Sequence, residues 1–250
     1  PMCTPTRVGL LTGRYPSPFG DQATTPCNER VLPFETETLA STLARVGYDT
    51  GLAGKWHLGS APQWGPNHFG FARSYGSLAG GCGQYSHLYK KGPYSQTWHR
   101  NESLVDEEGH TTDLIANEVV GWIEQQETPW FYYVPFTAVH VPVEVPEQYL
   151  KMYEEEGAFD SDPARDLSFR RYAAYTTHMD DAIGRILQAV ERTGQRENTL
   201  VIFTSDNGSF PSWSNRAYPG SFPDCPRLGS NLPYRGYKGQ LYEGGIRVPS

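Results

Sequence analysis

Five polar residues of types that bind or activate anions follow three apolar runs of the chain. Lys55 and His57 follow the first run, His140 follows the second, and Asp206 and Asn207 follow the third. In open α/β sheets, ligands bind beyond the carboxyl ends of the strands, where such side chains meet. If the three runs are neighbouring strands, the spacing predicts one site that combines cationic, imidazole and oxygen-donor groups.

Cys3 is the candidate nucleophile of that site. It stands before the segment Thr4–Gly13, in which Pro5 suits a first helical turn and Gly13 suits a helix end. The N-terminus of a helix favours negative charge and therefore lowers the pKa of a thiol. A lone cysteine in this position is more often a small buried side chain. The residues around Cys3 help to decide between a nucleophile and a buried structural thiol.

Five strings of this sequence resemble the motifs of the type I sulfatases, in the order of that family. Cys-Thr-Pro-Thr-Arg at 3–7, with Leu-Thr-Gly-Arg at 11–14, resembles the family signature. Gly-Lys-Trp-His-Leu-Gly at 54–59 resembles the second signature. The remaining matches are Val-His-Val-Pro at 139–142, Ser-Asp-Asn-Gly at 205–208, and the segment 238–247. Val-Pro-Glu-Gln-Tyr-Leu at 145–150 is similar to the arylsulfatase B (N-acetylgalactosamine-4-sulfatase-like) type.

The resemblance implies a covalent mechanism. In this family a formylglycine-generating enzyme converts the motif cysteine, here Cys3, to formylglycine. The hydrated aldehyde, a gem-diol, attacks sulfur and forms a covalent sulfo-enzyme, which then releases sulfate. Two easier steps thereby replace one difficult step.

The resemblance also implies roles for five cationic or imidazole residues around the sulfate. Arg7 and Lys55 hold the diol and offset charge, and His57 is the base that collapses the intermediate. Lys238 and His140 act on the leaving oxygen and the sulfate, with His140 as general acid.

Asp206 and Asn207 are the expected metal ligands. Their hard oxygen atoms suit Ca²⁺, with Mg²⁺ as an alternative, rather than zinc. Two ligands do not complete a calcium site, which takes six to eight oxygens. In the family two further aspartates precede the cysteine motif, and nothing here matches that segment. Asp180 and Asp181 fall within an expected helix and are interpreted as surface residues.

His87 is a weaker candidate. It lies in the part of the chain that shapes the substrate pocket in related enzymes, so we expect it to contact substrate. A structural histidine is the competing interpretation.

Periodicity and breakers predict alternating helices and strands. Apolar stripes favour helices at 4–13, 36–46, 111–126 and 169–192, and short apolar runs favour strands at 48–53, 130–135 and 199–204. The sequence of residues 64–101 predicts loops with short strands. This alternation indicates an α/β fold with a mainly parallel central sheet flanked by helices. The resemblance implies the alkaline-phosphatase-like sulfatase sandwich, incomplete at both ends.

Composition excludes some classes of function. The chain has 250 residues and a net charge of −7, which disfavours nucleic acid as a partner. Its longest apolar stretch, Trp130–Phe136, is far shorter than the roughly 20 residues of a membrane span. Four scattered cysteines form no disulfide framework.

The leading hypothesis is a metal-assisted hydrolase of sulfate esters, acting on a sulfated carbohydrate or an aryl sulfate. We expect residues 1–250 to be a partial sulfatase catalytic domain that lacks the N-terminal metal-binding strand and the C-terminal subdomain. A phosphatase or phosphodiesterase of the same superfamily and a catalytically silent glycan-binding fragment are the alternatives. The family works in the periplasm, outside the cell or in the lysosome.

Overall fold

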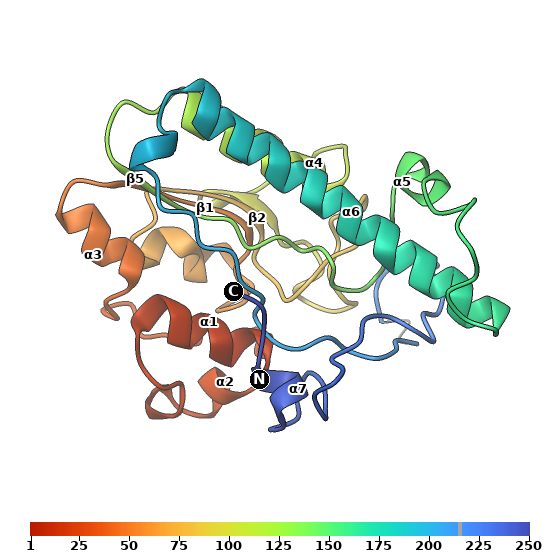
Figure 1. The fold of residues 1–250 in the computed structure, drawn as a ribbon. Helices are drawn as coiled ribbons and strands as arrows, with labels where there is room; N and C mark the ends of the chain where they lie inside the picture. The colour runs from red at the N-terminus through yellow and green to blue at the C-terminus, as the bar shows by residue number, and fades with distance from the viewer. Residues whose placement is uncertain (215–216) are drawn as a thin grey trace.

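Strand β1 (Asp49–Lys55) is the centre of the fold in the computed structural model, which describes residues 1–214 and 217–250. Helices lie on both sides of the sheet that contains β1 (Figure 1). The other helices and strands are α1 (Cys3–Thr12), α2 (Asp21–Thr24), α3 (Leu39–Arg45), β2 (Arg73–Ser77), β3 (Trp98–Arg100), β4 (Ser103–Leu104), α4 (Thr111–Glu124), β5 (Trp130–Tyr133), α5 (Glu147–Lys151), α6 (Pro163–Arg192) and α7 (Glu243–Ile246), with short 3-10 helices at Ser17–Phe19, Pro62–Trp64, Pro66–Phe69 and Arg196–Asn198.

The sheet has the order β4-β3-β2-β1-β5. Strand β1 pairs in parallel with β2 on one side and with β5 on the other, whereas β2–β3 and β3–β4 are antiparallel. The three central strands are therefore parallel, in line with the predicted mainly parallel sheet, although β2 lies in the segment predicted as loops with short strands. A short antiparallel extension adds β3 and β4. The carboxyl ends of the three central strands meet at one edge.

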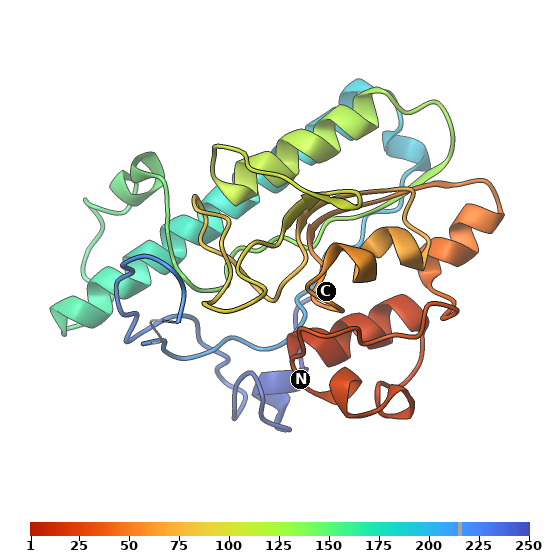
Figure 2. The ribbon, with the colours of Figure 1, turned by 180° about the vertical axis from the view of Figure 1, so that it is seen from behind.

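Alternation along β1 explains the two helical layers. Leu52 faces a core formed with α1 and α3, and Ala53 faces a second core formed with α4 and α6. Successive side chains of a strand point to opposite faces, so β1 contributes to both cores. Figure 2 shows the sheet between α4 and α6 on one side and α1 and α3 on the other.

Most predicted helices are confirmed, with shifted ends. Helix α1 ends before Gly13, which is left-handed with a φ of 66°. Helix α3 covers only the second part of the predicted 36–46 segment, because Thr38 forms a capping box with Ser41. Helix α6 begins six residues before the predicted start, where the side chain of Asp162 caps it.

The predicted buried strand at 199–204 is wrong. In the structure this segment forms no strand and pairs with no strand of the described residues. Leu200 is 85% exposed and Ile202 is 77% exposed. The apolar β-branched sequence favours a strand, but a strand needs a neighbour for its hydrogen bonds.

The described residues contain no helix with the length and apolar character to cross a membrane.

Candidate active site

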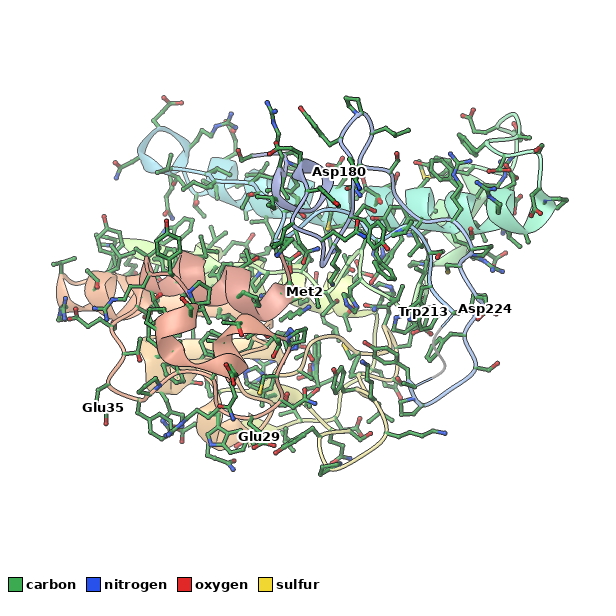
Figure 3. The ribbon with its side chains drawn as sticks, turned by 90° about the horizontal axis from the view of Figure 1, so that it is seen from below. Met2, Glu29, Glu35, Asp180, Trp213 and Asp224 are labelled. Carbon is green, nitrogen blue, oxygen red and sulfur yellow. The ribbon has the colours of Figure 1, made fainter. Side chains whose placement is uncertain are left out.

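Cys3 begins helix α1 and is almost completely buried. Lys238 Nζ donates a hydrogen bond to Cys3 Sγ at 3.2 Å, and Sγ lies 3.8 Å from Asn207 Oδ1. Burial alone would raise the pKa of the thiol, but Lys55, Lys238 and Arg7 lower it below its ordinary value. The structure therefore places Cys3 in a strongly cationic environment. Figure 3 labels the preceding residue, Met2, at the end of the helix that faces the middle of the molecule.

The end of β1 supplies Lys55 and His57, both buried. Gly54 allows this edge to approach the end of β5: its φ is 135°, and a Cβ there would lie 2.0 Å from the carbonyl oxygen of Pro135. Lys55 N donates to that same carbonyl at 2.7 Å. Burial is the main cause that lowers the pKa of Lys55, although Cys3 opposes it.

His57 has an unused ring nitrogen. Its Nδ1 is buried and has no hydrogen-bond partner among the described residues. Burial, and then Lys55 and Arg7, hold the pKa of His57 well below its usual value. The imidazole is therefore neutral near pH 7, with a ring nitrogen free to bind a ligand or take a proton.

His140 and Lys238 approach from other segments. His140 follows β5 in a turn closed by its own backbone N–H to the carbonyl of Thr137. His140 Nδ1 lies 2.7 Å from the carbonyl oxygen of Val141, which accepts a hydrogen bond from it. Burial, Lys55 and Lys238 lower the pKa of His140 well below its usual value. Lys238 reaches Cys3 because Gly239 N donates to the carbonyl of Pro1 at 2.9 Å.

Asp206 and Asn207 lie against the start of α1. Burial opposes ionisation of Asp206, but Lys55, Arg7 and Lys238 lower its pKa to about 2. Arg7 NH2 is 3.6 Å from Asp206 Oδ2, and Arg7 NH1 donates to the carbonyl of Lys55 at 2.5 Å. An ionised carboxylate and an amide oxygen near Cys3 have the donor chemistry of a Ca²⁺ or Mg²⁺ site.

Comparison with known proteins identifies the family of this chain. All residues, 1–250, match the family model described as Sulfatase. The chain belongs to the sulfatase family. The resemblance of the five motifs is therefore confirmed at the level of the family.

Curated sulfatases align with almost the whole chain. Arylsulfatase J of Mus musculus is 33% identical over 99% of this chain and 40% of its own length. N-acetylgalactosamine-6-sulfatase of Rattus norvegicus is 30% identical over all of this chain and 47% of its own length. This sulfatase chain thus spans less than half the length of both relatives.

A solved structure confirms the fold. The structure titled Ps i-CgsB in complex with k-i-k-neocarrahexaose superposes with a TM-score of 0.78 and 29% identity, over 98% of this chain and 54% of that chain. The α/β sandwich predicted from the sequence is therefore the sulfatase fold.

His87 is not brought into the cluster around Cys3. It is buried, stacks on Trp98 with ring centroids 4.6 Å apart, and has Nε2 2.9 Å from the carbonyl oxygen of Gly109. These contacts favour a structural role in this sulfatase. Its contact with substrate stays a prediction.

A second group of metal-ligand type lies between α4 and α6. Potential ligand atoms of His110, Asp113 and His178 lie within 4.8 Å of one another. Asp113 already binds both His178 and Arg185, at 3.0 and 2.8 Å, and His110 caps α4. These contacts indicate that the group links helix α4 to helix α6. Asp180, labelled in Figure 3, and Asp181 are exposed on α6, as predicted.

Sequence reasoning missed several residues that shape the cluster. The hydroxyl of Tyr133 accepts a hydrogen bond from Arg7. A Cβ at Gly80 would lie 2.5 Å from the ring of His57, and one at Gly81 would lie 3.1 Å from Nδ1 of His140. The two adjacent glycines, which are separated from the end of β2 by two residues, were the available signal for this close approach.

Proposed function

We propose that the protein hydrolyses sulfate esters, with Cys3 as the precursor of a formylglycine nucleophile. The observation that carries the proposal is the environment of Cys3 Sγ: Lys238 donates to it, and Lys55 and Arg7 act on it electrostatically. Three cations at one buried point suit an anionic ester and the charge that develops on its oxygens. When formed, formylglycine supplies a hydrated aldehyde whose hydroxyl attacks sulfur.

His57 is the proposed base of the reaction. Its neutral imidazole and unpartnered Nδ1 support this role, because a base must be deprotonated and within reach of the proton it accepts. Burial, and then the charge of Lys55, keep the imidazole neutral by lowering its pKa. Thr4 Oγ1 donates to the carbonyl of His57 at 3.1 Å and holds its backbone against helix α1.

Lys238 and His140 are the proposed donors to the sulfate and the leaving oxygen. Lys238 Nζ already donates a hydrogen bond to Cys3 Sγ. Burial, and then the charges of Lys55 and Lys238, lower the pKa of His140, so its imidazole is neutral in this structure. An anionic ester offsets those two charges, so its binding raises the pKa of His140 and makes it competent as general acid.

Asp206 and Asn207 are the proposed ligands of Ca²⁺, with Mg²⁺ as the alternative. A bound cation supplies charge stabilisation to the sulfate oxygens. The low pKa of Asp206 keeps its carboxylate available at all physiological pH values. Two protein oxygens do not fill a calcium shell, so further ligands must come from other residues of the full-length protein or from water.

A sulfated sugar is the proposed substrate class, with aryl sulfates as simple surrogates. The relatives include an N-acetylgalactosamine-6-sulfatase, and one similar structure is a complex with k-i-k-neocarrahexaose. A formylglycine-generating enzyme is then the maturation partner. The compartment would be the periplasm, the extracellular space or the lysosome.

The decisive experiment is the mass of the peptide that carries Cys3, from full-length protein made in its own host. We expect the mass of an aldehyde in place of the thiol. We also expect Cys3→Ala to abolish turnover of an aryl sulfate, whereas Cys27→Ala, a half-buried thiol outside the cluster, retains it. An unmodified thiol in folded protein, or a zinc-dependent phosphate-ester activity above the sulfatase activity, would overturn the proposal.

A further inference from the structure

Two threonine hydroxyls in the first turns of α1 bond outside their own helix. Thr4 Oγ1 donates to the carbonyl of His57, and Thr6 Oγ1 donates to the carbonyl of Asp206 at 2.7 Å. A helical threonine usually donates to a carbonyl of its own helix, as Thr12 does to Val8 in the same helix. The hydroxyls that flank Pro5 therefore connect the nucleophile helix to two other segments of the site.

The turn that carries Asp206 and Asn207 has few other connections to α1. The pair between Arg7 NH2 and Asp206 Oδ2 is long, at 3.6 Å, and the contact between Cys3 and Asn207 is 3.8 Å. Ser205 Oγ donates only to the carbonyl of Asn207, within the turn itself. The hydrogen bond from Thr6 is thus the short, well-defined one.

The backbone on either side of this turn adds little support. Within the described residues, 200–207 make no hydrogen bond from backbone to backbone, and the preceding apolar segment is exposed. The first backbone bond after the turn runs from Gly208 N to the carbonyl of Gly245 at 2.9 Å. Among the contacts between α1 and this turn, the hydrogen bond from Thr6 is therefore the shortest, at 2.7 Å.

We propose that Thr6 is a positioning residue that holds the Asp206–Asn207 turn against the nucleophile. The string at 3–7 then has two functions: it carries Cys3, and it sets the place of the two metal ligands relative to Cys3. The metal part of this inference rests on the proposed function. The hydrogen bond itself does not.

The first test is Ca²⁺ affinity by titration calorimetry, on full-length protein that keeps the Cys3 thiol. Thr6→Val removes the hydroxyl at nearly constant shape, and Thr6→Ser keeps it. We expect Thr6→Val to weaken Ca²⁺ binding by about 10- to 100-fold, as loss of a partner behind a metal ligand commonly does. Thr6→Ser should bind within about 3-fold of the parent by the same reasoning. Thr12→Val is the matched control, because it removes an intrahelical bond of the same helix, and it should leave affinity unchanged.

The second test needs no metal. Amide hydrogen exchange at Gly208, whose N–H donates to the carbonyl of Gly245, should accelerate in Thr6→Val and return to the parent rate in Thr6→Ser. Unchanged exchange and unchanged affinity in Thr6→Val would overturn the proposal. If the parent binds no Ca²⁺, the metal part of the proposed function fails, and exchange alone decides the role of Thr6. If Thr6→Val does not fold, Thr6→Ala removes the same hydroxyl without introducing a second apolar branch.

Discussion

The two halves of the candidate site are supported in different ways. Lys55 and His57 follow a strand with parallel partners on both sides, and the N–H groups of Trp56 and His57 continue the pairing to the carbonyls of Ser77 and Leu78. Asp206 and Asn207 follow a segment that pairs with no strand of the described residues. One half is therefore held by a backbone ladder, and the other by side chains of α1 and by the bond from Gly208 N to the carbonyl of Gly245.

This difference indicates where the site tolerates change. A backbone ladder consists of many hydrogen bonds, so the loss of one side-chain contact changes the position of His57 little. It also leaves no room for added atoms, because interiors of this kind are close-packed. A turn held by one short side-chain hydrogen bond and a few longer contacts has the opposite sensitivity. The following substitutions test that contrast.

Gly80→Ala should have the largest effect, on the ladder-held half. A Cβ at Gly80 would lie 2.5 Å from Cε1 and Nε2 of His57, so the imidazole must move. Misplacing a catalytic group by about 1 Å costs roughly 100-fold in rate, and we expect at least that loss in kcat for an aryl sulfate. Steady-state kinetics at saturating substrate measures it.

Gly121→Ala is the control for this substitution. Gly121 lies inside helix α4, and a Cβ there would meet nothing within 4 Å. Alanine should stabilise the helix by about 1 kcal/mol and leave kcat unchanged. Equal kcat in Gly80→Ala and the parent would show that the ladder-held half yields to an added methyl group.

Acid should destabilise the sheet region through His99. This histidine is buried on β3, bonds Ser74 and the carbonyl of Gly76, and has a pKa lowered to about 4 by burial. The unfolded chain holds it near 6.5, so between those values the unfolded state binds the extra proton and stability rises with pH. Between pH 7 and pH 5 the free energy of unfolding falls, and His99 accounts for about 2 kcal/mol of that fall.

Urea unfolding at both pH values measures that loss. The free energy of unfolding of His99→Gln should fall less between pH 7 and pH 5, by the contribution of His99, whatever the stability of the variant at pH 7. The exposed segment 200–203 carries no titratable side chain, so it makes no contribution of this kind. An unchanged pH dependence in His99→Gln would place the acid sensitivity elsewhere, with His110, whose pKa is also lowered to about 4, as the next candidate.

The same contrast explains what the sequence predicted. Local signals sufficed where local structure and tertiary contacts agree: Gly13 ends α1, and the apolar run before Lys55 is a strand in the sheet. The motifs also placed seven charged, imidazole or thiol residues in one cluster. The segment 199–204 failed because strand propensity depends on a neighbour that pairs with it. Thr6 and Gly80 were missed because a hydroxyl donor and a missing Cβ matter only once distant segments meet.

Thr4→Val should have a modest effect, in contrast to Thr6→Val. Thr4 is fully buried and donates to the carbonyl of His57, so its loss should cost about 1 kcal/mol of stability. The backbone N–H of His57 still donates to the carbonyl of Leu78, which keeps the imidazole in place. We therefore expect kcat to change by less than about threefold, or about 0.7 kcal/mol. A loss of kcat as large as that of Gly80→Ala would mean that the ladder does not hold His57.

Ile202→Ala should have the smallest effect of these substitutions. Ile202 is 77% exposed in a segment without a pairing strand, so truncation removes little buried apolar surface. We expect a change in the free energy of unfolding below about 0.5 kcal/mol in the 250-residue chain, measured by urea titration. Ile115→Ala is the matched substitution in the core between α4 and the sheet, and should cost about 2–5 kcal/mol. A cost above about 1 kcal/mol for Ile202→Ala exceeds that of an exposed side chain. It would mean that this segment packs against other apolar surface in solution, and the two halves of the site would then be held alike.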